Sequence, residues 1–574
     1  MNTQKNKINR LVVILSLATI LFSGCEKFLD EKPIANPTVE DYYKTINDLQ
    51  NSLTAVYNVL RRDNFIESEW LFGEGCSDNV VRFNTVSPYH EKARLMEFNK
   101  LASNNSYILQ RWEQNYAGIF RANHVIHYGP KIEDPTTGVD TMFTSRIICE
   151  AKFLRALFYF NLVKTYGGVP IKPDTLEIYV NGTDNFTQPK SSAEEVYAYI
   201  ERDLRESLLG LYHQEFGKYE LGKANTGAAA GLLIKVLAYQ AKNGTNDPKW
   251  SEALTIADAV VNGGSLGSET LVGRYLNSAI DSINLMARLK LPSIPQNIKF
   301  PTYSLTQYDA LWDYPGEFTS GSVFEINFEN THVGFDNFGS GWSDALVPVH
   351  AAAPVSKMLQ PAPFLAQLKT SDYRAKVSVI DQEQQIPGGN TPGGQGGPMF
   401  LSIYKWHIHP EDKAIEWNRQ GKNFKIMRFA EILLFYAEAL NETGNPAAAI
   451  DVLNRLRSRD EVNPKIYYQT EWEGVNPDLD ALPYGNYLEV RDNIWKERRI
   501  ELMFEFDRYF DLIRTGQAEE KFKEYNTNLF NEGVITELGG EYTKHWNPYI
   551  NKVFPIPFRE IELSNGAVKQ NPGY

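Results

Sequence analysis

Cysteine is scarce in this chain, which has only three in 574 residues: Cys25, Cys76 and Cys149. No two of them form a CxxC pair or a spacing typical of zinc ligands, so a thiol redox motif and a cysteine zinc site are not expected. Cys76 and Cys149 either pair as one disulfide or stay as two buried free thiols. Basic residues are also outnumbered, with 58 Lys and Arg against 71 Asp and Glu. The net charge of −13 argues against nucleic acid as a partner, because phosphate binding needs a basic patch.

Motifs of the common catalytic classes are missing as well. The sequence contains no GxSxG, no HExxH, no Walker loop and no GxGxxG after a strand. A glycine-rich run at 388–397 lacks the Lys-Ser/Thr pair that holds phosphate, and it is interpreted as a surface loop. His407 and His409 alternate as in a strand, but two histidines without a third nearby ligand are weak evidence for a metal. We therefore expect no catalytic residue, no cofactor and no metal.

A dense charge cluster at residues 497–508 is the one place where acid/base chemistry needs to be considered. Glu497, Glu501 and Glu505 alternate there with arginines. Paired carboxylates can hydrolyse glycosides, and the general acid of such a pair needs a raised pKa. Neighbouring arginines lower a carboxyl pKa instead. The cluster is therefore interpreted as a set of structural ion pairs.

The only long apolar run lies at the start of the chain. Three basic residues precede an apolar stretch at 11–22, which ends shortly before Cys25. This pattern is typical of a secretory signal, and the stretch is shorter than the roughly 20 residues of a membrane-spanning helix. The small residues just before Cys25 resemble the bacterial lipobox, in which the cysteine is acylated; the alternative is an ordinary signal with an incidental cysteine. We expect residues 1–24 to be a lipoprotein signal peptide and 25–40 a lipidated tether.

Helical periodicity recurs through the rest of the chain. It predicts helices over 41–61, 112–125 and 146–166, the last one ended by glycines and a proline. Trp112 and Trp495 fall inside such periodic stretches and are assigned to the core. The segment Ser191 to Glu194 has the form of a capping box that opens a further helix.

Two stretches share the order helix, short turn, helix, with small alanines where the helices would cross. The first joins 231–240 to 250–261, and the second joins 428–440 to 447–457. This is the tetratricopeptide pattern, although the two units are not contiguous in the sequence.

The sequence between these two units shows no regular periodicity. Residues 265–425 are rich in Gly, Pro, Asn and aromatics and contain one strand-like run at 322–328. Long irregular insertions on a helical frame commonly carry binding sites. We predict a mainly α fold of tetratricopeptide-like helical pairs, with a long, loop-rich ligand-binding insertion and minor β structure. No stretch has the composition of a hinge, so residues 41–574 are expected to form one domain.

Several segments together resemble the SusD/RagB family of outer-membrane nutrient-binding lipoproteins of Bacteroidetes. The most specific are EAKFLRALFYF at 150–160, continuing to YGGVP at 166–170, and RFAEILLFYAEALN at 428–441. The other similar segments are residues 25–33, 112–123, 454–459, 497–502, 508–514, 555–561 and 570–574. They follow the chain from the predicted anchor to its last residue and leave only the irregular middle unmatched.

The resemblance implies a non-catalytic protein on the outer membrane, anchored through a lipid on Cys25 and facing the cell surface. It also implies a partner, a SusC-like TonB-dependent transporter barrel, over which the lipoprotein sits as a lid. The implied ligand is an oligosaccharide or polysaccharide, and in some members a peptide. Two other hypotheses stay open: a tetratricopeptide-type membrane scaffold and a lipid-anchored glycosidase.

A sugar-binding surface needs flat aromatic side chains beside short polar groups, held on loops. Two parts of the chain meet this description: the loop after the first helices and the irregular middle. The candidate ligand-binding residues are Asp78, Asn79, Arg82, Tyr89, Trp312, Tyr314, Trp342 and Trp406. Core packing is the alternative for each of the aromatic residues.

Overall fold

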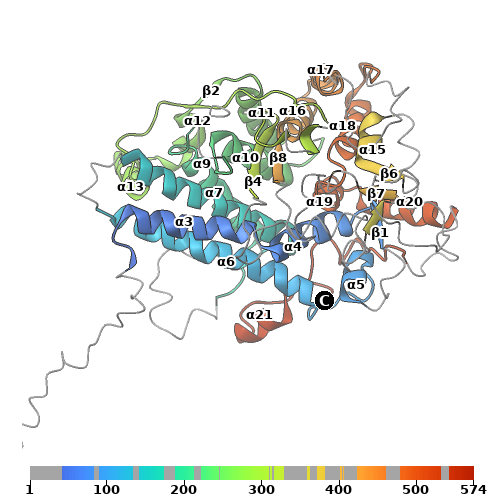
Figure 1. Cartoon of the computed structure of the whole chain (residues 1–574), viewed down its shortest axis with the longest axis horizontal. Coiled ribbons are helices and arrows are strands. Elements are labelled where there is room, and N and C mark those ends of the chain that lie inside the picture. Colours follow the sequence, from blue (N-terminus) through green and yellow to red (C-terminus); the bar gives the residue numbers. More distant parts are fainter. Residues whose placement is uncertain are drawn as a thin grey trace, which may run out of the picture.

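The computed structural model of the chain (Figure 1) describes residues 42–82, 90–133, 141–172, 188–212, 221–244, 246–308, 310–312, 316–328, 359–361, 372–381, 401–403, 405, 423–459, 479–531 and 542–574. The predicted signal peptide, Cys25 and the tether lie outside the described residues. So do His407, His409 and the glycine-rich run at 388–397.

Helices make up most of the described chain, as the sequence predicts. The α-helices are α3 (Ile46–Leu60), α4 (Asp63–Trp70), α5 (Glu91–Glu97), α6 (Ser106–Tyr128), α7 (Thr141–Tyr166), α9 (Ala193–Ser207), α10 (Thr226–Gln240), α11 (Pro248–Val261), α12 (Ser268–Val272), α13 (Ala279–Leu289), α15 (Tyr373–Ser378), α16 (Phe429–Glu442), α17 (Pro446–Arg457), α18 (Tyr487–Glu501), α19 (Arg508–Arg514), α20 (Ala518–Asn531) and α21 (Phe558–Leu563). A π-helix, η2 (Leu71–Gly75), continues α4, and short 3₁₀ turns form η3 (Gly129–Lys131), η5 (Gly273–Tyr275) and η6 (Ala310–Trp312).

The strands are few and short. They are β1 (Val80–Arg82), β2 (Ser265–Gly267), β3 (Asn297–Lys299), β4 (Ser322–Ile326), β5 (Leu359–Pro361), β6 (Val379–Asp381), β7 (Leu401–Ile403) and β8 (Phe424–Arg428). They pair antiparallel as β1–β5, β2–β3, β4–β8 and β6–β7, and the β4–β8 register is interrupted on either side of Phe324. The predicted strand at 322–328 is β4.

The helices pack in a continuous succession that forms the frame of the molecule. Helix α3 packs on α6, α6 on α7, α7 on α9, α9 on α10, α10 on α11, α11 on α16, and α16 on both α17 and α18. Helix α10 is apolar around nearly its whole circumference, so it is buried on all sides at the centre of this succession.

Both predicted tetratricopeptide-like pairs are confirmed, as α10–α11 and α16–α17. In the first pair the turn ends at Asp247, whose carboxylate accepts the backbone N–H of Lys249, and Pro248 begins α11. In the second pair Gly444 has φ +90°, which favours glycine, and Pro446 begins α17. Turn chemistry therefore sets both pairs.

Two local expectations need correction. The capping box of α9 is formed by Ser192 and Glu195, one residue later than predicted, because Ser192 is the last residue with extended backbone. The region expected to be irregular contains α13, which Ser278 caps by accepting the backbone N–H of Asp281. The helix is amphipathic, with Leu285 and Leu289 buried, so the sequence carried a periodic signal that the interpretation overlooked.

The remaining core assignments are mostly as predicted. Trp112 is buried, whereas Trp495 is half-buried and donates its indole N–H to Glu438 at 3.3 Å. Cys76 and Cys149 are both buried and free, which decides between the two alternatives. Within the part of the chain that the structure describes, no helix combines the length and apolar character that a membrane span requires.

Candidate functional site

One end of the molecule gathers the short strands that are built from distant parts of the chain. β1 pairs with β5, β5 contacts β7, β7 pairs with β6, and α15 joins β6 to α18. Figure 1 shows β1, β6, β7 and α15 together on the side that also carries α18 and α20. We call this group of β1, β5, β6, β7 and α15 the strand-bearing end. It contains β5, α15, β6 and β7 from the later part of the insertion predicted to bind ligand, together with β1 from the N-terminal half of the chain.

Buried ion pairs fasten the strand-bearing end to α18 and α19. Asp78, which lies just before β1, accepts Nε–H and Nη2–H of Arg508 at 2.8 and 3.0 Å and lies 3.1 Å from Nη2 of Arg499. The neighbouring Asn79 accepts Nε–H of Arg499 at 3.0 Å. Burial alone would raise the pKa of Asp78, but Arg499 and Arg508 hold it well below its usual range.

Glu501 is the centre of the same network. Its carboxylate accepts hydrogen bonds from Arg374 on α15 at 3.0 Å, Arg428 at the end of β8 at 3.1 Å and Arg459 at 2.7 Å. Burial acts to raise the pKa of Glu501, and the three guanidinium groups outweigh it and keep the pKa far below its usual range. A carboxyl group in this state cannot donate a proton to a leaving group at neutral pH.

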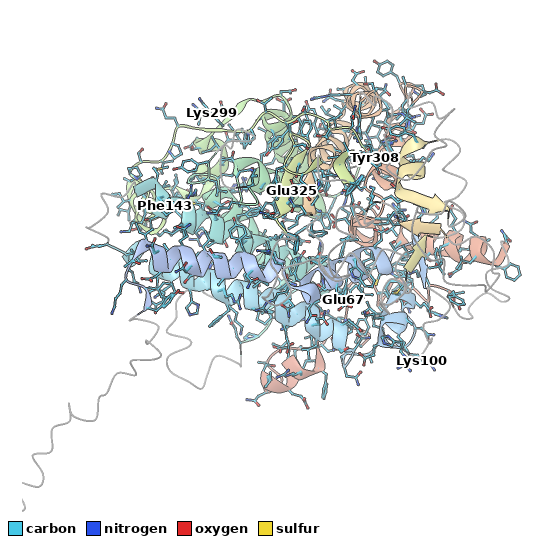
Figure 2. The ribbon with its side chains drawn as sticks, in the orientation of Figure 1. Glu67, Lys100, Phe143, Lys299, Tyr308 and Glu325 are labelled. Atoms are coloured by element: carbon cyan, nitrogen blue, oxygen red, sulfur yellow. The ribbon has the colours of Figure 1, made fainter. Side chains whose placement is uncertain are left out.

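Trp312 belongs to this buried layer rather than to the surface. The Nζ of Lys405, the residue that follows β7 by two positions, lies 4.5 Å from the Trp312 ring centroid and 4.9 Å from that of Tyr308. The Tyr308 hydroxyl donates to the backbone carbonyl of Glu501 at 3.2 Å. Figure 2 shows Tyr308 on the side of the molecule that carries α15 and α18. Burial lowers the pKa of Lys405 to about 8, against the opposing effect of Glu505.

A strained turn between α18 and α19 directs two acidic side chains, Glu505 and Asp507, toward different basic partners. Phe504 and Phe506 have φ values of +62° and +71°, which bulky residues rarely adopt. Between them Glu505 pairs with Lys405 at 2.7 Å and with Arg428, while Asp507 pairs with Lys164 at 3.4 Å. The turn therefore joins the strand-bearing end to the helical frame.

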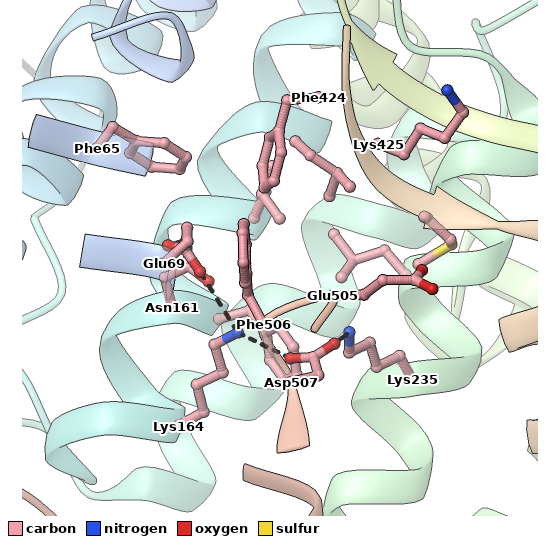
Figure 3. Close-up of a pocket in the computed structure, with 15 residues that line it drawn as sticks. Phe65, Glu69, Asn161, Lys164, Lys235, Phe424, Lys425, Glu505, Phe506 and Asp507 are labelled. Atoms are coloured by element: carbon pink, nitrogen blue, oxygen red, sulfur yellow. Dashed lines mark hydrogen bonds and ion pairs between the residues drawn. The ribbon is translucent and has the colours of Figure 1, made fainter. Parts of the chain in front are cut away.

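Beside this turn lies a small cavity of about 50 Å³ (Figure 3). Figure 3 shows Lys164 and Lys235 converging on Asp507, with the Phe506 ring beside them. That ring stacks on Phe424 with ring centroids 5.5 Å apart. The volume has room for a few water molecules, and it is far below the roughly 300–1,000 Å³ typical of small-ligand sites. The cavity is therefore not a ligand pocket.

Three of the eight candidate ligand residues have described side chains: Asp78, Asn79 and Trp312. None of the three is more than 2% exposed, and each contacts charged groups of the network. Their burial argues against direct contact with a ligand. The prediction is corrected accordingly: these residues support the strand-bearing end from beneath.

The side chains of the other five candidates lie outside the described part of the chain. The backbone of Arg82 lies in β1, and its side chain lies outside the described part of the chain. Tyr89, Tyr314, Trp342 and Trp406 lie outside the described residues altogether. Among the side chains that are described, no three of His, Cys, Asp and Glu gather in a way that would hold a metal ion.

The sequence interpretation missed the basic residues that complete the network. Arg374 and Lys405 lie in the irregular region, where no periodicity marks them. No local signal marks Lys405 either, because its cation–π partners Tyr308 and Trp312 lie more than 90 positions away in the chain.

Two protein-family models match this chain, one toward each end. Residues 372–574 match the model of the SusD family, and residues 27–237 match a family model described as starch-binding associating with outer membrane. SusD-like protein P38 of Formosa agariphila is 25% identical over 99% of this chain and 99% of its own length.

Solved structures show the same fold. A SusD homolog from Bacteroides thetaiotaomicron is 24% identical, with a TM-score of 0.71, and covers 93% of this chain and 98% of its own. A laminarin-binding SusD-like protein is 23% identical, with a TM-score of 0.66, and covers 93% of this chain and 100% of its own. The two family models together match residues 27–237 and 372–574, and the chain belongs to the SusD/RagB family.

Proposed function

We propose that this protein is a cell-surface lipoprotein that binds a nutrient oligosaccharide and delivers it to a SusC-like TonB-dependent transporter, without catalysis. The observation that carries the proposal is the match of residues 27–237 to a family of starch-binding proteins that associate with the outer membrane. A laminarin-binding protein of the same fold supports the ligand class. A peptide ligand is the alternative within the family.

The strand-bearing end is the proposed place of binding. A ligand site needs side chains held firmly on a supported framework, and buried ion pairs tie this end to α18 and α19. Arg82 lies in β1, Tyr314 follows Trp312 by two residues, and Trp406 follows Lys405 directly. Together with Tyr89 and Trp342, these residues are the proposed ligand contacts.

The charge chemistry of the described residues supports binding without turnover. A glycosidase needs one carboxyl group with a raised pKa beside a carboxylate, both facing a cleft. Here Glu501 and Asp511 have lowered pKa values because arginines surround them. Glu74 has a raised pKa beside the ionised Asp78, but both side chains are buried and face no cleft. This favours a binding protein over a lipid-anchored glycosidase.

We also propose that the protein is a lipid-anchored protein of the outer membrane with a single folded domain. Residues 1–24 act as the signal peptide, acylated Cys25 anchors the chain, 25–40 form the tether, and 41–574 act as one unit. A single lipidated N-terminus on a short polar segment suits a lid that moves over a transporter.

A glycan array with site variants tests the proposed contacts. We expect the purified chain to bind at least one neutral glycan, and Trp342→Ala combined with Trp406→Ala to weaken that binding at least roughly tenfold, since each loses a stacking surface. Tyr549→Ala, at a tyrosine that is 91% exposed in the C-terminal segment, is the control and should bind normally. Binding of peptides but of no glycan would select the alternative ligand.

A further inference from the structure

A concave surface lies on the helical frame, on the opposite side from the strand-bearing end. It is a groove of about 570 Å³ between α9 and the segment formed by η5 and α13. Figure 1 shows α13 at the edge of the molecule remote from β1, β6 and β7. Its volume falls within the roughly 300–1,000 Å³ typical of sites for small ligands.

Local chemistry fixes both walls of the groove. The capping box of Ser192 and Glu195 opens α9, and Ser278 caps α13 on the opposite wall. Helix α13 is held against the frame by Leu285 and Leu289, which are buried, and it packs on α7. The groove is therefore a preformed feature between two anchored helices, which reduces the entropic cost of binding.

Three arginines line the groove, and each is paired with at least one carboxylate while its side chain stays partly exposed. Arg202 donates Nε–H to Glu206 at 2.9 Å, and Arg288 donates Nε–H to the same carboxylate at 3.3 Å. Arg274 pairs with Glu252, and its Nη1 lies 3.9 Å from Glu201. Their side chains remain 48%, 38% and 44% exposed, respectively. Because a guanidinium has five N–H donors, each arginine is held in position while donors stay available to a ligand.

Glu206 anchors this arrangement from below. Lys152, a buried cation on α7, lies 3.1 Å from its carboxylate. Burial acts to raise the pKa of Glu206, but Lys152, Arg288 and Arg202 together lower it to about 2. The carboxylate therefore stays ionised and keeps both arginines in place throughout the physiological range.

The rest of the lining distinguishes between classes of ligand. Tyr199 and Tyr275 are half-buried and supply aromatic surface, and Asn277 and Asn284 supply amide groups. The three arginines are balanced by the carboxylates of Glu195, Glu206 and Asp281. A strongly anionic ligand needs an excess of positive charge, which this lining lacks. Tyrosines, amides and balanced charges suit a ligand that presents apolar C–H faces and hydroxyl groups.

We propose that the groove between α9 and α13 is a second saccharide-binding site, which takes a short, neutral oligosaccharide separately from the strand-bearing end. The assignment of a saccharide ligand rests on the proposed function, because a protein that binds glycans at the cell surface encounters oligosaccharides there. A second site would hold part of a long glycan while the first site engages another part, and the effective concentration at each site would rise.

Hydrogen exchange of the purified full chain tests the proposal with laminarihexaose, maltohexaose and xylohexaose as probes. We expect at least one probe to slow exchange in 193–207 and 272–289. Tyr275→Ala combined with Asn277→Ala should abolish that protection and weaken binding at this site roughly tenfold. Asn284→Ala alone, at an exposed position, is a milder second variant in case the double variant unfolds. Tyr549→Ala is the matched control and should leave the protection unchanged.

The outcomes separate this proposal from the proposed function. A probe that binds and protects only β1 and the residues near Trp312 overturns the second site and leaves glycan binding intact. Protection of the groove by a peptide or by a charged oligosaccharide, but by no neutral probe, overturns the ligand class. A chain that binds no glycan by calorimetry and shows no protection anywhere overturns both. Protection confined to the groove supports the second site and contradicts binding at the strand-bearing end.

Discussion

Two buried acids four residues apart, Glu74 and Asp78, show how partners decide the state of a carboxyl group. Asp78 has two arginine partners and stays ionised, whereas Glu74 on η2 accepts one hydrogen bond from the Asn79 amide at 2.9 Å. Burial raises the pKa of Glu74 to about 7, and the nearby charge of Asp78 adds to the rise. Glu74 is therefore expected to be protonated in mildly acidic solution and to titrate near neutrality.

Glu74→Gln should change the pH dependence of stability. Since the folded pKa of Glu74 is raised from 4.5 to about 7, its stabilising effect is complete below about pH 4.5 and is lost as the pH rises through about 7. Between pH 5 and pH 8 the free energy of unfolding of the wild type should fall relative to that of the variant, by on the order of 2–3 kcal/mol. Urea unfolding at both pH values measures this, and parallel pH profiles would contradict the account.

Glu501→Gln should be among the most damaging single changes in the molecule. The substitution leaves Arg374, Arg428 and Arg459 buried without their shared carboxylate. Loss of one partner of a buried ion pair costs about 3–5 kcal/mol. Denaturant unfolding should show a loss of that size, while Glu520→Gln, at a side chain that is 80% exposed, should change little. Equal stability of the two variants would mean that the network contributes nothing.

At the scale of residues, sequence reasoning succeeds where the cause is local. Alternating glutamates and arginines at 497–508 predict structural ion pairs, and the structure confirms them. Asp78 was wrongly expected to face a ligand because its partner Arg508 lies 430 positions away in the chain. Trp312 lies in aperiodic sequence, which suggested exposure, but a basic residue from the other side of the insertion covers it.

At the scale of elements, the decisive contact joins η2 to the turn between α18 and α19. A Cβ built on Gly73 would lie 1.6 Å from the backbone carbonyl oxygen of Phe506. Phe506 itself has a positive φ and stacks on Phe424. Glycine at position 73 therefore allows the close approach that holds this strained turn, and with it Glu505 and Asp507, in place.

Gly73→Ala should destabilise the chain by roughly 3 kcal/mol or more, because the clash is with backbone and cannot be relieved by a rotamer change. Thermal unfolding measures the loss. Gly264→Ala is the control, since a Cβ there meets no atom closer than 3.5 Å. An alanine at 73 that leaves the melting temperature unchanged would show that η2 and the turn are not in close contact.

Element prediction followed periodicity closely. The long helices α6 and α7 and both tetratricopeptide-like pairs were predictable because one apolar stripe, or a fully apolar helix, marks each of them. Helix α13 was missed although its sequence is amphipathic and Ser278 gives it a capping residue, because the surrounding residues were interpreted together as one irregular insertion. The three-residue strands had no recognisable sequence pattern, because strands this short form only where a partner strand lies beside them.

At the scale of the whole molecule, a helical frame carries two concave or loop-bearing regions at opposite ends. The frame was predictable from the sequence, whereas the division of the insertion between the two ends of the molecule was not. The ligand surface was not predictable either, because its candidate residues depend on long-range contacts.

The anchor can be tested at this scale by Cys25→Ser. Without acylation the chain loses the apolar group that would hold it in the membrane. It should move from the detergent phase to the aqueous phase in a phase-partition assay, and Thr38→Ala, in the same polar segment, should behave like the wild type. A variant that stays in the detergent phase would contradict lipidation at this residue.

The central claim is that this chain binds a neutral glycan and does not cleave it. Isothermal titration of the purified chain with a panel of neutral polysaccharides and their hexasaccharides, followed by chromatography of the same samples, tests both halves together. The account predicts saturable binding with micromolar affinity for at least one glycan, with the ligand recovered intact. No heat with any member of the panel, or shortened oligosaccharides after incubation, would contradict it.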